Sequence, residues 1–132
     1  MSKVTHYPTG ALGFPNSHTL TVVIDDISTA GSSWTGSLPF DYEIENGYVT
    51  LYGAITGSDA SITVEVNGTA VDAFVATVPV SGSGPGVTTA FVVPSGGPTN
   101  EVAEGDALEI ITDGASTGVV KAIINISVRR RA

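Results

Sequence analysis

Near its C-terminus the chain reads Val120-Lys121-Ala122-Ile123-Ile124-Asn125-Ile126-Ser127-Val128-Arg129, and apolar residues recur there at every second position. Side chains of a β-strand point alternately to its two faces, so a period of two predicts a strand with one buried face. The residues expected on the buried face are Val120, Ala122, Ile124, Ile126 and Val128. The other face is mostly polar and carries Lys121, Ile123, Asn125, Ser127 and Arg129. A helix would instead repeat its apolar residues every three or four positions.

The same alternation predicts a strand at residues 19–24 and a hairpin further along the chain. Residues 62–66 alternate in the same way and end at Asn67-Gly68. An Asn-Gly pair readily supplies the two positive φ angles of a type I′ turn. A β-hairpin running from residues 62–66 into residues 69–80 is therefore predicted.

Apolar, β-branched segments separated by glycine-rich turns fill the rest of the chain. Further strands are predicted at residues 33–40, 48–55, 87–93 and 107–112. Other segments are predicted to be irregular: turns at Asn46-Gly47, Gly57-Ser58-Asp59 and Asp113-Gly114, a flexible connection at 81–86 and a long loop at 94–104. Valine, isoleucine and threonine favour strands over helices. The expected fold is all-β, an antiparallel β-sandwich of about eight strands and of jelly-roll type, with an immunoglobulin-like sandwich as the alternative.

The 132 residues are enough for one domain, which is expected at residues 19–132 after an extended N-terminal arm at residues 1–18. The arm has no strand or helix period, and its prolines oppose both structures. It nevertheless carries Tyr7, Leu12 and Phe14, and each large apolar side chain left in water forgoes roughly 1.5–3 kcal/mol of burial. We expect these three residues to contact another subunit or another protein, the alternatives being contact with their own domain and a terminus without contacts.

Composition argues against several classes of function. The chain has no cysteine, which removes disulfides, thiolate nucleophiles and cysteine-ligated zinc. Five Lys and Arg against 13 Asp and Glu give a formal net charge of −8, which repels nucleic-acid phosphates and anionic lipids. No apolar run is long enough to span a bilayer, and the N-terminal residues lack the apolar stretch of a signal peptide. We expect no nucleic-acid partner, no membrane partner and no export.

Patterns of catalytic or metal-binding residues are also missing. His6 and His18 are the only histidines, and their spacing matches no common metal site. The chain has no nucleophile elbow, no phosphate-binding loop motif and no metalloprotease motif, and its glycine-rich stretch at residues 82–86 precedes a strand rather than a helix. We expect no catalytic residue, no metal site and no cofactor, and hence a protein that is not an enzyme.

Two charged segments are candidates for contact with a partner. Asp41, Glu43 and Glu45 alternate and would share one solvent-facing side of an extended segment. Charges that keep an edge strand from pairing are the favoured interpretation, followed by contact with a basic partner and then by catalysis or calcium binding. Three of the five basic residues form the run Arg129-Arg130-Arg131, which predicts a solvated tail or a clamp onto an acidic neighbour.

Aromatic residues offer a third candidate site. Tyr48 and Tyr52 are predicted on one strand face, with Trp34 in a neighbouring strand. Exposed aromatic rings in a row bind sugar rings, but the same residues also pack between sheets or at subunit interfaces. Packing or an interface is favoured over a sugar-binding platform.

Three segments carry a family resemblance: VVIDDISTAGS at residues 22–32, TVEVNGTAV at residues 63–71 and VAEGDALEIITDGASTG at residues 102–118. In these strand-and-turn patterns the chain resembles the capsid decoration (cement) and head-fibre proteins of tailed bacteriophages. The resemblance covers roughly residues 20–128, and the arm and residues 39–45 do not fit its pattern.

The resemblance implies a structural protein of the virion, made in the host cytoplasm, that binds the exterior of an assembled capsid and stabilises it. Its partners would be the major capsid protein and further copies of itself, as a dimer or trimer, and it would bring no catalytic, metal or cofactor residues. The arm residues Tyr7, Leu12 and Phe14 would then contact the capsid or a neighbouring subunit. A carbohydrate-binding or host-adhesion module of a virion fibre is the alternative, and it would use the aromatic residues.

Overall fold

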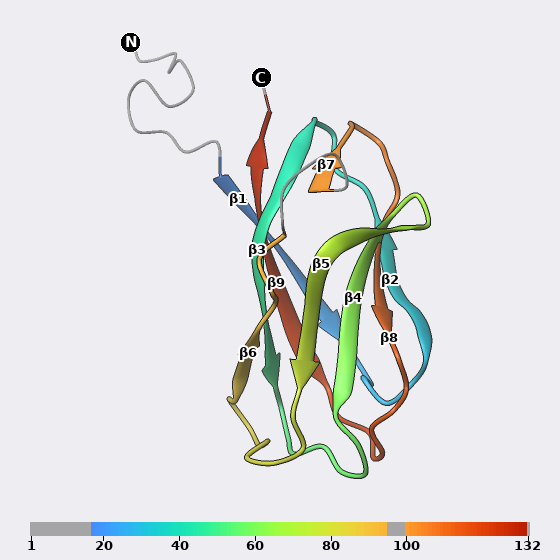
Figure 1. The fold of residues 1–132 in the computed structure, drawn as a ribbon, viewed down its shortest axis with the longest axis vertical. Coiled ribbons are helices and arrows are strands. Elements are labelled where there is room, and N and C mark those ends of the chain that lie inside the picture. Colours follow the sequence, from blue (N-terminus) through green and yellow to red (C-terminus); the bar gives the residue numbers. More distant parts are fainter. Residues whose placement is uncertain (1–16, 95–99, 132) are drawn as a thin grey trace.

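The computed structural model describes residues 17–94 and 100–131, in which nine β-strands and no α-helix occur (Figure 1). The strands are β1 Ser17–Ile24, β2 Gly31–Gly36, β3 Tyr42–Leu51, β4 Ala60–Val66, β5 Thr69–Val78, β6 Thr88–Ala90, β7 Glu101–Val102, β8 Leu108–Thr112 and β9 Ala122–Arg130. The all-β prediction is confirmed for this part of the chain.

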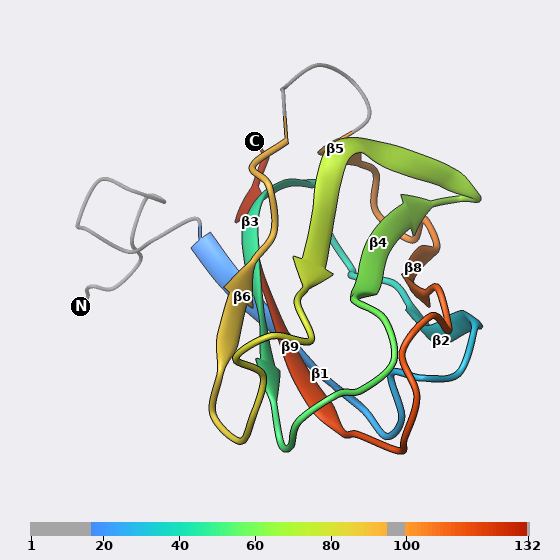
Figure 2. The same cartoon turned by 60° about the horizontal axis from the view of Figure 1, so that its bottom comes forward.

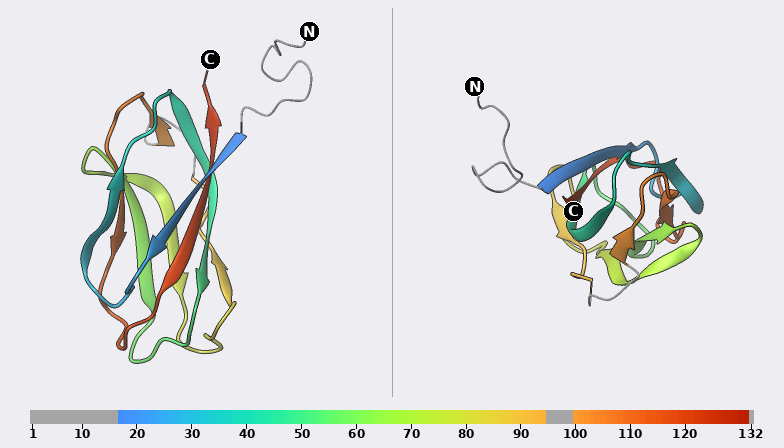
Figure 3. Two further views of the ribbon diagram at one scale, coloured as in Figure 1. Left: turned by 180° about the vertical axis from the view of Figure 1, so that it is seen from behind. Right: turned by 90° about the horizontal axis from the view of Figure 1, so that it is seen from above.

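The strands form two antiparallel sheets that face each other. The five-stranded sheet has the order β1-β9-β3-β6, with the short β7 also paired to β3, and the four-stranded sheet has the order β2-β8-β4-β5. Figure 2 shows the two sheets on opposite sides of the molecule, and Figure 3 shows β1 beside β9, its neighbour at the edge of the five-stranded sheet.

The core lies between the sheets and follows the alternation that the sequence predicts. In β9 the inward side chains are fully buried, whereas Ile123, Asn125 and Ser127 are only half-buried. In β1 the same holds, with Val22 and Ile24 buried. Burying each such side chain contributes roughly 1.5–3 kcal/mol, which fixes the register of both strands.

The predicted hairpin is confirmed. β4 and β5 pair antiparallel and are joined at Asn67-Gly68, whose φ angles are 49° and 83°. Both angles are positive, as a type I′ turn requires.

The predicted turn at Asn46-Gly47 is wrong, because both residues lie inside β3. The register of β3 with β9 shifts between Ile44 and Asn46, which leaves Glu45 as the extra residue of a β-bulge.

Gly47 serves close packing instead of a turn. A Cβ at this position would lie 2.9 Å from the Phe91 ring and 3.1 Å from both the Phe74 ring and the Asn125 carbonyl oxygen. The two phenyl rings are stacked, with centroids 4.5 Å apart, and they pack directly against the bare backbone of β3. Asn46-Gly47 therefore has the same sequence as the hairpin turn at Asn67-Gly68, but its glycine is needed for close packing and not for a turn.

Another prediction also fails in the segment after β6. The long loop expected at residues 94–104 contains β7, which pairs with β3 through Val102 and Glu101. The described residues therefore hold nine strands rather than about eight. A two-residue strand has no periodicity to detect, since its pairing depends on a partner about sixty positions away.

Candidate partner-binding surfaces

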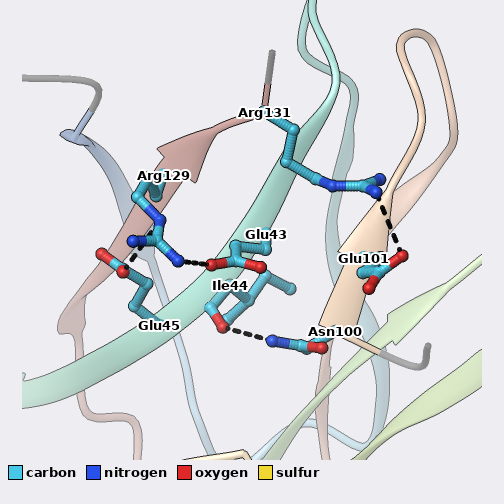
Figure 4. A network of polar contacts seen from close by, with 7 residues as sticks. All are labelled: Glu43, Ile44, Glu45, Asn100, Glu101, Arg129 and Arg131. Carbon is cyan, nitrogen blue, oxygen red and sulfur yellow. Dashed lines mark hydrogen bonds and ion pairs between the residues drawn. The ribbon is translucent and has the colours of Figure 1, made fainter. Parts of the chain in front are cut away.

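The acidic segment and the arginine run are far apart in sequence but meet at one end of the five-stranded sheet (Figure 4). Arg129 of β9 lies opposite Glu43 of β3, and the Arg129 guanidinium forms an ion pair with the Glu43 carboxylate. The same guanidinium lies 3.5 Å from the Glu45 carboxylate. The hydrogen bond to Glu43, followed by the charges of both carboxylates, raises the pKa of Arg129. Two of the three candidate acids are thus paired within their own chain.

The β-bulge explains how both glutamates reach one arginine. Glu45 and Asn46 are consecutive, yet both are only half-buried, and full burial resumes at Gly47. The extra residue turns two neighbours to the outer side and leaves Glu45 beside Arg129, which is a common use of bulges.

Arg131 and Asp41 extend this network to the loop that carries β7. The Arg131 guanidinium lies 3.3 Å from the Glu101 carboxylate, and the Arg131 N–H donates to the Asp41 carbonyl at 2.9 Å. The Asp41 carboxylate in turn accepts a bond of 2.8 Å from the Glu104 N–H. Arg131, the described residue after β9, is therefore held through both its backbone and its side chain.

A side-chain hydrogen bond next to β7 also joins this segment to β3. Asn100, which directly precedes it, donates from its side-chain amide to the Ile44 carbonyl at 3.1 Å (Figure 4). β3 thus lies between β9 on one side and β6 and β7 on the other. The interpretation of Asp41, Glu43 and Glu45 as guards of an edge strand is wrong for this reason.

Arg130 is the third member of the run and contacts an aromatic ring. Its guanidinium lies 5.2 Å from the centroid of Phe40, within the range of a cation–π interaction. The His18 ring lies 5.1 Å from the same ring. Contact of Arg129, Arg130 and Arg131 with a partner stays a prediction, but each of them also has a partner within this chain.

The aromatic candidates do not form one platform. Trp34 lies on β2 in the four-stranded sheet, partly buried against the core, and its ring fills the space that a side chain at Gly36 would need. Tyr48 lies on the outer side of β3 in the other sheet, and Tyr52 directly follows that strand. The two tyrosines are 48% and 52% exposed, and the Lys121 ammonium lies 5.5 Å from the centre of the Tyr52 ring. Two rings, not three, therefore remain as an exposed aromatic pair.

The middle of the outer face of the five-stranded sheet has no charged residue; we call it the neutral face. Strand register defines two rows across it, Thr21–Asn125–Tyr48–Ala90 and Val23–Ile123–Thr50–Thr88. Polar members bond to one another, as in the 2.6 Å contact between Thr21 and Asn125 and the 2.9 Å contact between Thr50 and Thr88. Among the described residues, charged side chains on this outer face lie toward the two ends of the sheet, at Lys121 and at the Arg129 ion pairs. Sequence reasoning missed this surface because it emerges only once the register of four strands is known.

The four-stranded sheet differs in charge. Its strands carry three acids, Glu65, Asp72 and Glu109, and no Lys or Arg in the part of the chain that the structure describes. Glu65 and Glu109 lie directly opposite each other on β4 and β8, an arrangement that costs stability. The middle of one outer face of the molecule is thus neutral, and the other outer face is acidic.

Two titratable groups elsewhere have shifted pKa values. Burial, with a smaller effect of the Asp106 charge, raises the pKa of Tyr42 to about 12, and its hydroxyl has no hydrogen-bond partner among the described residues. Hydrogen bonds from the hydroxyl and backbone N–H of Ser28, at 2.6 and 2.9 Å, lower the pKa of Asp26. Asp26 therefore stabilises the turn after β1, as the side chain of an Asx turn does.

The arm residues Tyr7, Leu12 and Phe14 lie outside the described residues, so their predicted contacts stay predictions. Within residues 17–94 and 100–131, no three or more metal-ligating side chains come together. Helices that could cross a membrane are likewise not found in those ranges.

Comparison with known proteins gives structural likeness but no family. No protein-family model matches the chain, and no curated protein matches it. Among solved structures, the chain is similar to a chain of the structure described as "Cyanophage Pam1 capsid asymmetric unit", with 9% identity, coverage of 98% of this chain and 95% of that chain, and a TM-score of 0.48. At that identity and TM-score the likeness establishes neither a shared fold nor a shared function.

Proposed function

We propose that this chain is a structural virion protein that binds the exterior of an assembled phage capsid and stabilises it as a decoration protein, without catalytic activity. The neutral face is the observation that carries the docking role. The capsid as target comes from the sequence resemblance over residues 20–128.

The neutral face has the composition of a protein interface. Charged residues are depleted and aromatic residues enriched in the buried centre of such interfaces. Thirteen acids and five bases are spread over this chain, yet two whole rows of four strands carry none. Val23 and Tyr48 within it are about half exposed, and Val92 just after β6 is 56% exposed. An uncharged and partly apolar surface of this kind on an acidic protein favours a docked partner.

The strand order supports the jelly-roll assignment within this proposal. When the two-residue β7 is left aside, eight strands remain, four in each sheet. The chain crosses from one sheet to the other at nearly every step, and only β4 and β5 are sequential neighbours. Two four-stranded antiparallel sheets with long crossovers are typical of jelly rolls.

In this proposal the partners are the major capsid protein and further copies of the chain, as a dimer or trimer. The neutral face would lie on the shell and the acidic four-stranded sheet would face the solvent. Tyr7, Leu12 and Phe14 would add contacts to the shell or to a neighbouring subunit, because a tethered arm binds at high effective concentration.

The test is binding to purified, undecorated shells of the phage that encodes the chain, measured by co-sedimentation. Tyr48→Lys places a charge in the centre of the neutral face, and Thr63→Lys places the same charge on the outer side of the four-stranded sheet. We expect the wild type and Thr63→Lys to bind and Tyr48→Lys to bind at least about tenfold more weakly, a loss of about 1.4 kcal/mol. Absence of wild-type binding, or equal binding of both variants, contradicts the proposal.

A second candidate function rests on the exposed pair Tyr48 and Tyr52. Half-exposed rings beside threonine and asparagine side chains offer stacking and hydrogen bonds to a sugar. Glycan-array binding that is lost on Tyr52→Ala and kept on Trp34→Ala would place carbohydrate binding ahead of capsid binding.

A further inference from the structure

The four sheet edges are protected to very different degrees. An exposed strand edge presents unpaired N–H and C=O groups, and proteins protect it with bulges, charges, prolines or very short strands. The far edge of the five-stranded sheet consists of β6 and β7, with three and two residues. The Val92 N–H beyond β6 also bonds to the Val75 carbonyl of β5 at 2.9 Å, which joins the two sheets on that side.

Both edges of the four-stranded sheet are irregular. The register of β2 with β8 shifts between Ser32 and Trp34. β5 carries a charge at Asp72 and a left-handed residue at Ala73, whose φ is 63°, and its register with β4 is also broken. Irregular backbone of this kind does not accept a further strand.

β1 has none of these devices. Its eight residues, Ser17–Ile24, pair with β9 without a single register shift, and they include no proline, glycine, lysine, arginine or carboxylate. No backbone hydrogen bond joins residues 17–24 to any described segment other than β9. Because alternate residues of an antiparallel strand direct their backbone groups to each side, the outer side of β1 presents a regular row of donors and acceptors.

We infer that the free edge of β1 pairs with β1 of a second copy, antiparallel and about a two-fold axis, which joins two five-stranded sheets into one continuous sheet. This inference does not depend on capsid binding.

A second copy is the occupant that the charges favour. Two-fold pairing places residues of one strand against residues of the same strand, so a charge near the axis would come close to its own copy. The outward side chains of β1 are Ser17, Thr19, Thr21 and Val23, which carry no charge.

The acids that directly follow β1 do not oppose this partner. In antiparallel pairing the two strands run in opposite directions, so Asp25 and Asp26 of one copy lie at the opposite end of the paired strands from Asp25 and Asp26 of the other. The pairing therefore brings none of these four carboxylates against another.

The chain has no cysteine, so single cysteines report this interface directly. In two-fold antiparallel pairing one residue of β1 lies opposite itself, and its neighbours pair symmetrically about it. Thr19→Cys, Thr21→Cys and Val23→Cys are oxidised alone and in pairwise mixtures, and disulfide-linked dimers are measured on non-reducing gels. Thr88→Cys, exposed on the opposite sheet edge, is the control. We expect one variant or one mixture to cross-link at least about tenfold more than the control.

Sedimentation equilibrium of the full chain provides an independent measurement. We expect a wild-type dimer whose dissociation constant increases at least about tenfold in the double variant Thr19→Lys/Thr21→Lys and little in Thr88→Lys. A monomer at all concentrations, equal cross-linking of the control, or equal weakening by Thr88→Lys overturns the inference. A monomer that instead protects residues 17–24 from hydrogen exchange only when shells are added also overturns it, and assigns the edge to a strand of another protein.

Discussion

Tyr42 shows at the scale of one residue how burial and hydrogen bonding oppose each other. Its ring is fully buried and meets the Phe40 ring edge-on at 5.9 Å, which stabilises the fold, whereas its hydroxyl has no partner among the described residues. A buried hydroxyl without a partner costs about 1–3 kcal/mol. We expect Tyr42→Phe to keep the ring contacts and to raise the free energy of unfolding by about 1 kcal/mol at pH 7, measured by urea denaturation. A loss of stability would show that the hydroxyl has a partner in the folded state.

The same residue predicts a pH dependence. Its pKa is raised from 10.0 to about 12 on folding, so the folded state favours the neutral phenol. The corresponding stability is fully present below pH 10 and is lost as the pH rises through 12, by roughly 3 kcal/mol in total at about 1.4 kcal/mol per pKa unit. Tyr42→Phe should remove this component of the alkaline loss, as urea denaturation at pH 9, 10.5 and 12 would reveal.

Ala73 is a second residue whose backbone carries a cost. Its φ of 63° is unfavourable for any residue with a Cβ. We expect Ala73→Gly to raise the free energy of unfolding by about 0.5–1 kcal/mol. Ala70→Gly, in the same strand but without a positive φ, should lower it by a similar amount, because glycine loses more entropy on folding. If both variants are destabilised, Ala73 is not strained.

The two Asn-Gly pairs mark the limit of inference from single residues. Asn67-Gly68 forms the predicted turn, since the alternating segments on both sides pair with each other. Asn46-Gly47 has the same letters but lies in a strand, because the Phe74 and Phe91 rings need the space above Gly47. Those rings come from distant parts of the chain, so no local pattern could reveal them.

At the scale of elements, the packing of β3 depends on the absence of a side chain at Gly47. Gly47→Ala places a Cβ 2.9 Å from the Phe91 ring, and overpacking of this kind costs about 1–3 kcal/mol. We expect this loss in urea denaturation. Gly53→Ala, just after the same strand, is the matched control, because a Cβ there meets nothing within 4 Å. Equal stability of both variants would show that the stacked rings move aside at little cost.

Elements with their own periodicity were predictable and those without it were not. β1, β4 and β9 alternate and β5 follows the Asn67-Gly68 turn, and all four lie where the sequence predicts them within a few residues. β7 has two residues, and the position of Trp34 in the other sheet from Tyr48 depends on strand order. Of the candidate site, sequence therefore indicated the acidic and basic segments but not their pairing, and it gave no sign of the neutral face.

For the whole molecule, the distribution of charge matters more than the net charge. Glu65→Lys and Glu43→Lys both change the net charge from −8 by +2. Glu65 lies opposite Glu109, so its reversal should raise the free energy of unfolding by about 0.5 kcal/mol. Glu43 pairs with Arg129, so its reversal should lower the thermal midpoint. Stabilisation by both variants would mean that net charge dominates, and both effects should shrink in 0.5 M salt.

The central position of β9 determines when the protein can fold. β1 and β3 both need β9 as their neighbour in the sheet, and Thr21 meets Asn125 across 104 positions of chain. During synthesis on the ribosome, β1 and β3 therefore lack their shared partner strand until β9 emerges. The β4–β5 hairpin can form earlier, because its two strands are adjacent in sequence. Closing such long loops costs chain entropy before the contacts between the distant strands can offset that cost. We therefore expect slow folding, on the order of milliseconds to seconds. During this interval the free strand edges are exposed to other chains, so β1 can meet a second copy before its own sheet is complete.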